Sequence, residues 1–301
     1  MKILITLFTA VSIFFSFGSY AKTIMLSTKG PGAGNPFWAS VEAGAKDAAA
    51  EFGVDLIILS PPQESDVMAQ VAQIEDQIAK GVDAIAIAPT DPNAVAPILE
   101  EAMAAGVPVV YIDTNGINEG VTFIGTNNIN GAKLAADYIC SQIPKGSDVA
   151  ILQGMITQTT GQHRAEGSNK GLTECGMNIV AELPANWDTA KGMSVMEDII
   201  TGNPNIKAVF ASNDNMGLGA IEALKNADML DDVVVVGFDA NPDAAASVAK
   251  GEMSATVAQF SYNMGYMGVE NALKLANGET IPDNIDTGTV LVTKENAADF
   301  M

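Results

Sequence analysis

The apolar residues of this chain fall into short continuous runs, separated by segments in which apolar residues recur every three or four positions. The runs lack the polar alternation of a half-exposed strand, which is typical of parallel strands buried on both faces. The intervening segments have the spacing of amphipathic helices. Short links rich in Gly, Pro and Asn join the two kinds of segment. The pattern predicts an α/β protein built on doubly wound parallel sheets.

The elements can be placed along the chain from this pattern. We first expect strands at residues 23–27, 55–59, 84–88 and 109–112, with helices at 37–52, 65–80 and 93–105. The pattern then restarts, and the second set of strands is expected at 148–153, 179–183, 208–211, 233–238 and 255–258. The helices of this second set are expected at 131–143, 162–174, 189–201 and 216–227.

The restart of the pattern bears on the number of lobes. A single parallel sheet of this length would be unusual, so two similar lobes are predicted. No Pro- or Ser-rich linker separates the two sets of elements. The boundary near residues 127–130 is therefore expected to be a hinge between packed lobes, because a flexible tether would need such a linker.

The N-terminus has the three parts of a cleavable export signal. Lys2 gives a basic start, residues 3–17 are almost wholly apolar, and Ser19-Tyr20-Ala21 has the small-x-small form of a cleavage site. A membrane anchor is the alternative, but the run is shorter than the ~20 apolar residues that a span needs. We expect residues 1–21 to be removed and the mature protein to be periplasmic. No lipid anchor is expected, because Lys22 and not Cys follows the cut.

The charge of the chain excludes several classes of partner. The sequence has 15 basic and 36 acidic residues, a net charge of −21. Nucleic acid and anionic membrane surfaces bind clustered Lys and Arg, so neither is an expected partner. No nucleotide cofactor is expected either, because the chain has neither a G-x-G-x-x-G loop nor a phosphate-binding GK[ST] motif. An enzyme is also not expected, since His163 is the only histidine and no G-x-S-x-G elbow presents a serine.

Two cysteines, Cys140 and Cys175, are present. An even pair in an oxidising compartment favours a disulfide, and two buried free thiols are the alternative. A pair of cysteines with a single histidine is too few for a zinc site, so no metal is expected.

Polar and aromatic side chains follow several of the predicted strands. Ligands of open α/β sheets bind beyond the carboxyl ends of the strands, so these residues are candidates for binding a solute. The polar candidates are Asn35, Asp113, Asn213, Asp239 and Gln259. Carboxylates and amides match sugar hydroxyls, although any one Asp could instead cap a helix.

Aromatic side chains occur in the same predicted loops. Phe37 and Trp38 follow Asn35, and Trp187 lies in a polar loop. Aromatic faces pack on the C–H face of a sugar, whereas the alternative for each ring is core packing.

Arg164 is the only arginine in the sequence, since every other basic residue is lysine. A surface ion pair could use lysine, so this position is expected to need the planar guanidinium. Such a group donates paired hydrogen bonds to hydroxyls or to carboxylates in a cleft. The alternative is a structural ion pair to Glu166 or to a nearby Asp.

Seven segments of the chain together resemble one protein family. They are GNPFW (34–38), VDAIAIAPTDPNAV (82–95), PVVYID (108–113), LPANWD (183–188), AVFASNDNMGLGA (208–220), VVVVGFDANPD (233–243) and SATVAQ (254–259). In this order they resemble the ribose/allose group of type I periplasmic sugar-binding proteins. The resemblance implies two Rossmann-like lobes, joined by three hinge strands, that close on one pyranose. It implies lobes made of residues 22–126 with 260–288, and of 127–259 with 289–301.

The resemblance also implies a site and partners. Its site would be Asn35, Phe37, Trp38, Asp113, Arg164, Trp187, Asn213, Asp239 and Gln259. The ligand would be a small neutral sugar or polyol, and the partner an ABC permease of the inner membrane. A chemoreceptor is an alternative partner, and a furanosyl signal like autoinducer-2 is an alternative ligand.

The chain departs from the ribose proteins at three places. Thr114 stands where they carry a second arginine, Ala88 stands where they carry an asparagine, and the loop from Lys29 to Gly34 is longer than usual. Losing an Arg and an amide removes donors matched to ribose, at about 1 kcal/mol or more per hydrogen bond. We therefore expect another pentose, a hexose or a sugar alcohol, and we add Lys29 and Thr114 to the site candidates.

Overall fold

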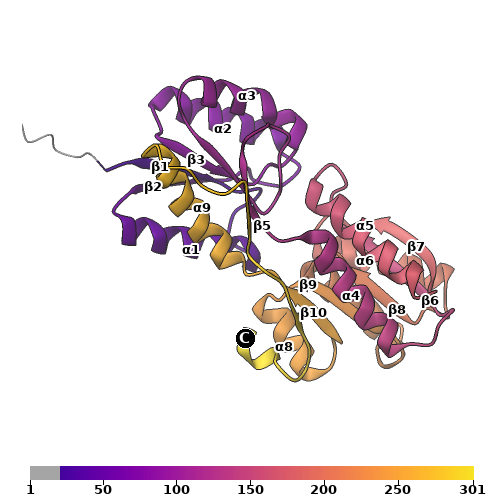
Figure 1. Ribbon diagram of the computed structural model, residues 1–301. Helices are drawn as coiled ribbons and strands as arrows, with labels where there is room; N and C mark the ends of the chain where they lie inside the picture. The colour runs from indigo at the N-terminus through magenta and orange to yellow at the C-terminus, as the bar shows by residue number, and fades with distance from the viewer. Residues whose placement is uncertain (1–20) are drawn as a thin grey trace, which may run out of the picture.

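The computed structural model describes residues 21–301, which form two α/β lobes (Figure 1). Each lobe holds a six-stranded sheet with helices on both faces, which confirms the predicted fold class. The predicted signal peptide, residues 1–21, lies outside the described residues except for its last position. Within residues 21–301, none of the helices has the length and apolar character needed to cross a membrane.

The first sheet has the strand order β11-β5-β4-β3-β1-β2, and all of its neighbouring strands are parallel. Helices α1 and α9 cover one face, and α2 and α3 cover the other (Figure 1). The central strands β3 and β4 are buried along their whole length, which explains their continuous apolar runs. The strands are β1 (Thr23–Ser27), β2 (Asp55–Leu59), β3 (Ala84–Ile87), β4 (Val109–Ile112), β5 (Thr122–Gly125) and β11 (Asn284–Asp286). The helices are α1 (Pro36–Phe52), α2 (Val67–Lys80), α3 (Pro92–Ala104) and α9 (Ser261–Ala276).

The second sheet has the order β12-β10-β9-β8-β6-β7, and only β12 runs antiparallel to its neighbour. Helices α4 and α5 pack against each other on one face, while α6, α7 and α8 cover the other. The strands are β6 (Asp148–Gln153), β7 (Asn178–Pro184), β8 (Ala208–Ala211), β9 (Val234–Asp239), β10 (Ala255–Ala258) and β12 (Val290–Val292). The helices are α4 (Asn128–Gln142), α5 (Thr159–Glu174), α6 (Thr189–Gly202), α7 (Asp214–Asn226) and α8 (Pro242–Lys250), and the 3-10 turns are η1 (Leu230–Asp232) and η2 (Ala297–Phe300).

The chain passes between the sheets after β5, after β10 and after β11. One buried residue from each passage contacts the others: the Thr287 hydroxyl donates to the Gln259 carbonyl (3.1 Å) and lies 3.4 Å from the Thr126 hydroxyl. These contacts tie the three connections together where the lobes meet. We propose the lobe boundaries at residues 127, 260 and 289 because they fall at these passages.

Two helices, α4 and α5, begin three residues earlier than the apolar pattern predicts. Helix α4 starts at Asn128, within the expected hinge, because the Asn127 side chain caps it through the Asn130 amide (3.1 Å). Helix α5 starts at Thr159, so Arg164 lies in its second turn. The first residues of α5 are Thr, Gly and Gln, which give no apolar periodicity. Gly161 is required here, since a Cβ atom would lie 2.2 Å from the Met155 carbonyl oxygen.

Cys140 of α4 and Cys175, which ends α5, form a disulfide with Cα atoms 6.3 Å apart. The bond joins residues 35 apart in sequence. We expect the Cys140→Ser/Cys175→Ser variant to lose about 2–4 kcal/mol of unfolding free energy, because the open chain gains entropy when unfolded. Urea unfolding followed by circular dichroism would measure the loss. Equal midpoints for the variant and the oxidised parent would contradict it.

Candidate ligand-binding site

A cavity lies between the lobes, beyond the carboxyl ends of both sheets, and encloses about 340 Å³, part of it open to solvent. The structure brings together Lys29 and all nine residues that carry the family's motifs. The lining residues are Lys29, Asn35, Phe37, Trp38, Glu64, Asp113, Thr160, Arg164, Trp187, Asn213, Asp239 and Gln259.

The first lobe supplies an amide, two rings and a carboxylate. Asn35 caps α1 by accepting a hydrogen bond from the Phe37 amide (3.1 Å), and Pro36 opens the helix. The cap fixes Phe37 and Trp38 on the first turn, where their rings meet edge to face at 4.9 Å. Asp113 follows β4 and is almost fully buried. The loops after β1 and β4 therefore place these four side chains at the cavity.

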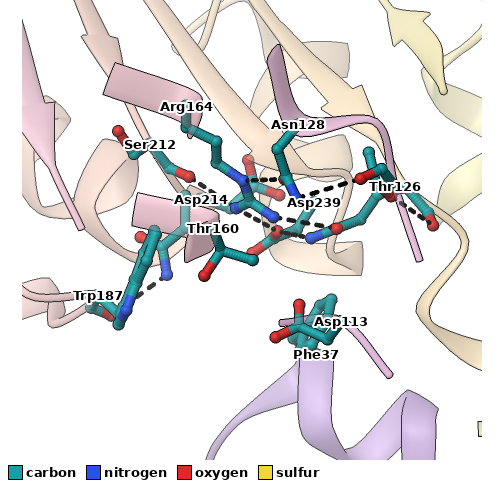
Figure 2. Close-up of polar contacts among 12 residues, drawn as sticks. Phe37, Asp113, Thr126, Asn128, Thr160, Arg164, Trp187, Ser212, Asp214 and Asp239 are labelled. Carbon is teal, nitrogen blue, oxygen red and sulfur yellow. Dashed lines mark hydrogen bonds and ion pairs between the residues drawn. The ribbon is translucent and has the colours of Figure 1, made fainter. Parts of the chain in front are cut away.

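Arg164 is the centre of the polar cluster in the second lobe (Figure 2). Its Nε donates to Asn128 Oδ1 (2.7 Å), Nη1 to the Ser212 carbonyl (2.8 Å) and Nη2 to Gln259 Oε1 (3.0 Å). The guanidinium also stacks 3.9 Å from the centre of the Phe238 ring. A lysine could not make this planar set of contacts, which explains the single arginine of the sequence.

The acidic partner of Arg164 is an aspartate, Asp239, and not Glu166. Asp239 Oδ1 lies 3.4 Å from Arg164 Nη1 and also accepts a hydrogen bond from Gln259. Burial raises the pKa of Asp239 well above its ordinary value, against the attraction of Arg164. Oδ2 of Asp239 accepts no hydrogen bond from any described residue, so it is available to a solute hydroxyl. Figure 2 shows Phe37 and Asp113 facing this cluster from the other lobe.

A second buried carboxylate, Asp214, lies beneath the site. It accepts hydrogen bonds from Thr256 Oγ1 (2.6 Å) and from the Asn241 amide (2.8 Å). Burial raises its pKa from 3.8 to about 6, although these hydrogen bonds and Arg164 lower it. Asp214 is absent from the cavity lining, so its role is to support the loop after β9.

The raised pKa of Asp214 predicts how stability changes with pH. Between the unfolded value of 3.8 and the folded value of about 6, the folded chain holds a proton that the unfolded chain releases. Ionised Asp214 therefore destabilises the folded chain. This destabilisation is fully present above the folded pKa and is relieved as the pH falls through it. Between about pH 7 and pH 5 we expect the parent to gain on the order of 1 kcal/mol relative to Asp214→Asn, which cannot titrate there. Melting curves of both proteins at the two pH values would measure this difference. Equal changes of melting temperature in the two proteins would contradict it.

Two tryptophans, one from each lobe, line the cavity. Trp38 is almost fully buried, so it serves both as core packing and as a wall of the site. The Trp187 ring lies against Gly154, where a Cβ atom would come within 1.9 Å of it. The Arg164 guanidinium carbon is 5.5 Å from the centre of the Trp187 ring. The glycine therefore makes room for an aromatic wall beside the arginine.

Helix capping explains Asn213, which accepts a hydrogen bond from the Met216 amide (2.9 Å) and donates to the Trp187 carbonyl (3.3 Å). The helix N-cap that was the alternative for an aspartate is thus found here at an amide, as it is at Asn35. Both residues nevertheless line the cavity, so capping fixes their side chains at its edge.

Three site residues adopt backbone angles that side chains disfavour: Asp113 (φ 57°), Trp187 (φ 67°) and Asp239 (φ 128°). Such angles cost energy in residues other than glycine and concentrate at functional sites. Their coincidence at the ends of β4, β7 and β9 supports a binding role for these loops.

Thr114 does not line the cavity, unlike the other candidates. Its hydroxyl donates to Asp113 Oδ2 (2.7 Å) and accepts from Lys29 Nζ (3.0 Å). Glu64 and Thr160 do line it, and the sequence did not identify them because neither lies in a recognisable motif. Among residues 21–301, no group of three or more His, Cys, Asp or Glu side chains could hold a metal ion.

Comparisons with known proteins agree with this architecture. The family model described as periplasmic binding protein domain matches residues 29–280. The ribose import binding protein of Escherichia coli (strain K12) is 35% identical over 262 residues, which cover 87% of this chain and 88% of that protein.

Two solved structures are also similar. An ABC transporter periplasmic solute-binding protein from Actinobacillus succinogenes 130z, with bound D-allose, has a TM-score of 0.87 and 33% identity over 92% of this chain and 99% of that one. An ABC transporter solute-binding protein from Bacillus halodurans C-125, with bound myo-inositol, has a TM-score of 0.86 and 29% identity over 95% and 99%. These relatives are solute-binding proteins and not enzymes. The chain belongs to the periplasmic binding protein family and, within it, to the ribose/allose group of type I periplasmic sugar-binding proteins.

Proposed function

We propose that the protein captures one neutral sugar or polyol between its lobes and delivers it to an ABC importer. The observation that carries this proposal is the pairing of charges in the cavity. Lys29 Nζ lies 3.1 Å from Asp113 Oδ2, and Arg164 Nη1 lies 3.4 Å from Asp239 Oδ1. Each cation in the cavity thus has its own carboxylate, which leaves no unpaired cation for an anionic solute.

The free groups of the cavity match hydroxyls. Asp113 Oδ1 and Asp239 Oδ2 accept no hydrogen bond from the residues that the structure describes, so each can accept one from a hydroxyl. The Asn35 amide likewise keeps its N–H donors, since only its oxygen is used within residues 21–301. The rings of Phe37, Trp38 and Trp187 provide apolar faces for C–H groups.

The polar groups of the cavity differ from those that the family resemblance implies for a ribose site. Thr114 is turned into contacts with Asp113 and Lys29, and Ala88 offers no side-chain donor. The Ala88 carbonyl accepts a hydrogen bond from the Gln70 side chain, Nε2 (2.9 Å). We therefore propose a pentose other than ribose, a hexose or a sugar alcohol.

A thermal-shift screen of pentoses, hexoses, sugar alcohols and charged small solutes would test the proposal. We expect at least one neutral polyhydroxy compound to raise the melting temperature, and mass spectrometry to find the same compound co-purifying with the protein. Stabilisation by charged solutes alone would contradict the proposed solute class.

The N-terminus of the purified protein tests the proposed export to the periplasm. Protein recovered from the periplasm is expected to begin at Lys22, as intact-mass measurement would show. A mature chain that retains residues 1–21 would contradict cleavage after Ala21.

A further inference from the structure

Four side chains form a chain of hydrogen bonds across the cleft, with a tryptophan at each end and Glu64 and Gln158 between them. In the first lobe, Trp38 Nε1 donates to Glu64 Oε1 (3.1 Å). In the second, Trp187 Nε1 donates to Gln158 Oε1 (2.9 Å). The link between the lobes is the hydrogen bond from Gln158 Nε2 to Glu64 Oε2 (3.3 Å). Each tryptophan is therefore held by a residue that contacts the opposite lobe.

Lys29 adds a second link at the same place. Its Nζ donates to Gln158 Oε1 (2.9 Å) and lies 3.7 Å from Glu64 Oε2. The ammonium is 5.6 Å from the centre of the Trp38 ring and 5.7 Å from that of Trp187, within the range of cation–π attraction. Its other partners belong to its own lobe: it donates a hydrogen bond to Thr114 and forms an ion pair with Asp113. The cation thus connects both rings to the crossing point.

Gln158 has no hydrogen-bonding capacity left for a solute. Its oxygen accepts from Lys29 and Trp187, and its nitrogen donates to Glu64 and to the Thr90 carbonyl (3.2 Å). The side chain is fully buried and does not line the cavity. Its contacts with Lys29, Glu64 and Thr90 all cross between the lobes, so its role concerns closure and not direct contact with the ligand.

These contacts lie between the inner cavity and the outside. An outer groove spans both lobes and is partly lined by Gln63, Ser65 and Asn186. Asn35, Glu64 and Trp187 line both this groove and the inner cavity. The Glu64–Gln158 contact is therefore placed where a solute would leave the site.

We propose that Gln158 is a positioning residue, which forms a latch with Lys29 and Glu64 that closes the lobes and fixes both tryptophan rings over the site. The latch consists of contacts between protein side chains alone, so part of the free energy of closure is independent of the solute. Its members come from both lobes, and separating the lobes breaks it. The inference does not depend on which solute is bound.

The two tryptophans allow a direct test, because the sequence contains only these two. Intrinsic fluorescence of the solute-free protein therefore reports on both sides of the latch, and small-angle X-ray scattering reports on the separation of the lobes. Gln158→Glu places a carboxylate against Glu64 and the Thr90 carbonyl, so repulsion replaces two hydrogen bonds. We expect this variant to emit at longer wavelength, to have a larger radius of gyration and to lose about tenfold in closed population.

Adding Glu64→Gln to Gln158→Glu restores a donor–acceptor pair with the roles exchanged. We expect the double variant to recover most of the parent's emission wavelength and radius of gyration. Gln162→Ala is the matched control, since Gln162 is an exposed glutamine on the same helix, and it should match the parent. Far-UV circular dichroism confirms folding, and Gln158→Met provides an uncharged variant that should also open.

Two results would overturn the latch. In the first, the parent and Gln158→Glu have the same scattering and emission, which would mean that the contacts do not hold the lobes. In the second, Gln158→Glu opens but the double variant stays open, which would assign the effect to a buried charge and not to this pair. Both readouts are made without solute, so a failure of the proposed sugar function would leave them unaffected.

Discussion

Replacing Arg164 with alanine is expected to weaken solute binding by about 2–5 kcal/mol, roughly 30-fold to several thousand-fold in Kd. The guanidinium joins Asn128, the Ser212 carbonyl and Gln259, and it faces Asp239. Its removal leaves these groups unpaired at the wall of the cavity. Isothermal titration calorimetry with the compound identified in the thermal-shift screen would measure the loss.

Arg164→Lys separates the effect of charge from that of shape. Lysine keeps the positive charge beside Asp239 but cannot reach three acceptors in one plane, so we expect a large part of the loss to remain. Melting curves establish that both variants are folded. Unchanged affinity in a folded Arg164→Ala protein would mean that the solute binds elsewhere.

Replacing Asp239 with alanine is expected to cost a similar 2–5 kcal/mol, because it removes a buried acceptor for a solute hydroxyl and leaves Arg164 without its counter-charge. Asp243→Ala is the matched control: Asp243 lies exposed on the first turn of α8, and its removal should leave the affinity unchanged. Calorimetry under the same conditions compares the two. If they bind equally well, Asp239 does not contact the solute.

The two losses should not add. Arg164 holds the ionised form of Asp239 against the effect of burial, which raises the pKa of that carboxyl. Without Arg164, Asp239 is therefore more readily protonated and becomes a poorer acceptor. We expect the Arg164→Ala/Asp239→Ala protein to bind about as weakly as either single variant, since coupled neighbours lose one shared interaction.

Most of the sheet strands could be predicted from the sequence because they are buried on both faces. Strands β3, β4 and β8 are wholly apolar, and their runs gave the positions within one residue. The apolar pattern did not reveal β5, β11 or β12. The last two are three-residue, partly exposed edge strands, and they form by pairing with strands from earlier in the chain, β11 with β5 and β12 with β10.

The residues of the candidate site also divide into those that the sequence could predict and those that it could not. Residues at the ends of central strands, such as Asp113 and Asp239, follow from the rule that ligands bind at the carboxyl ends of parallel strands. Arg164 was indicated by composition, as the only arginine of the sequence, and by the family resemblance. The roles of Gln158 and Glu64 could not be predicted, because they depend on a hydrogen bond that forms only when the two lobes come together.

Neither lobe is a continuous piece of chain, and this has a consequence for folding during synthesis. The first sheet is completed by β11 and the second by β12, both close to the C-terminus. A ribosome must therefore release nearly the whole chain before either sheet has its last strand. The pairing of β11 with β5, which joins residues far apart in sequence, should also form slowly. The nascent chain should thus stay accessible to chaperones or a translocase for most of its synthesis, and a single lobe is better produced by circular permutation than by cutting the gene in two.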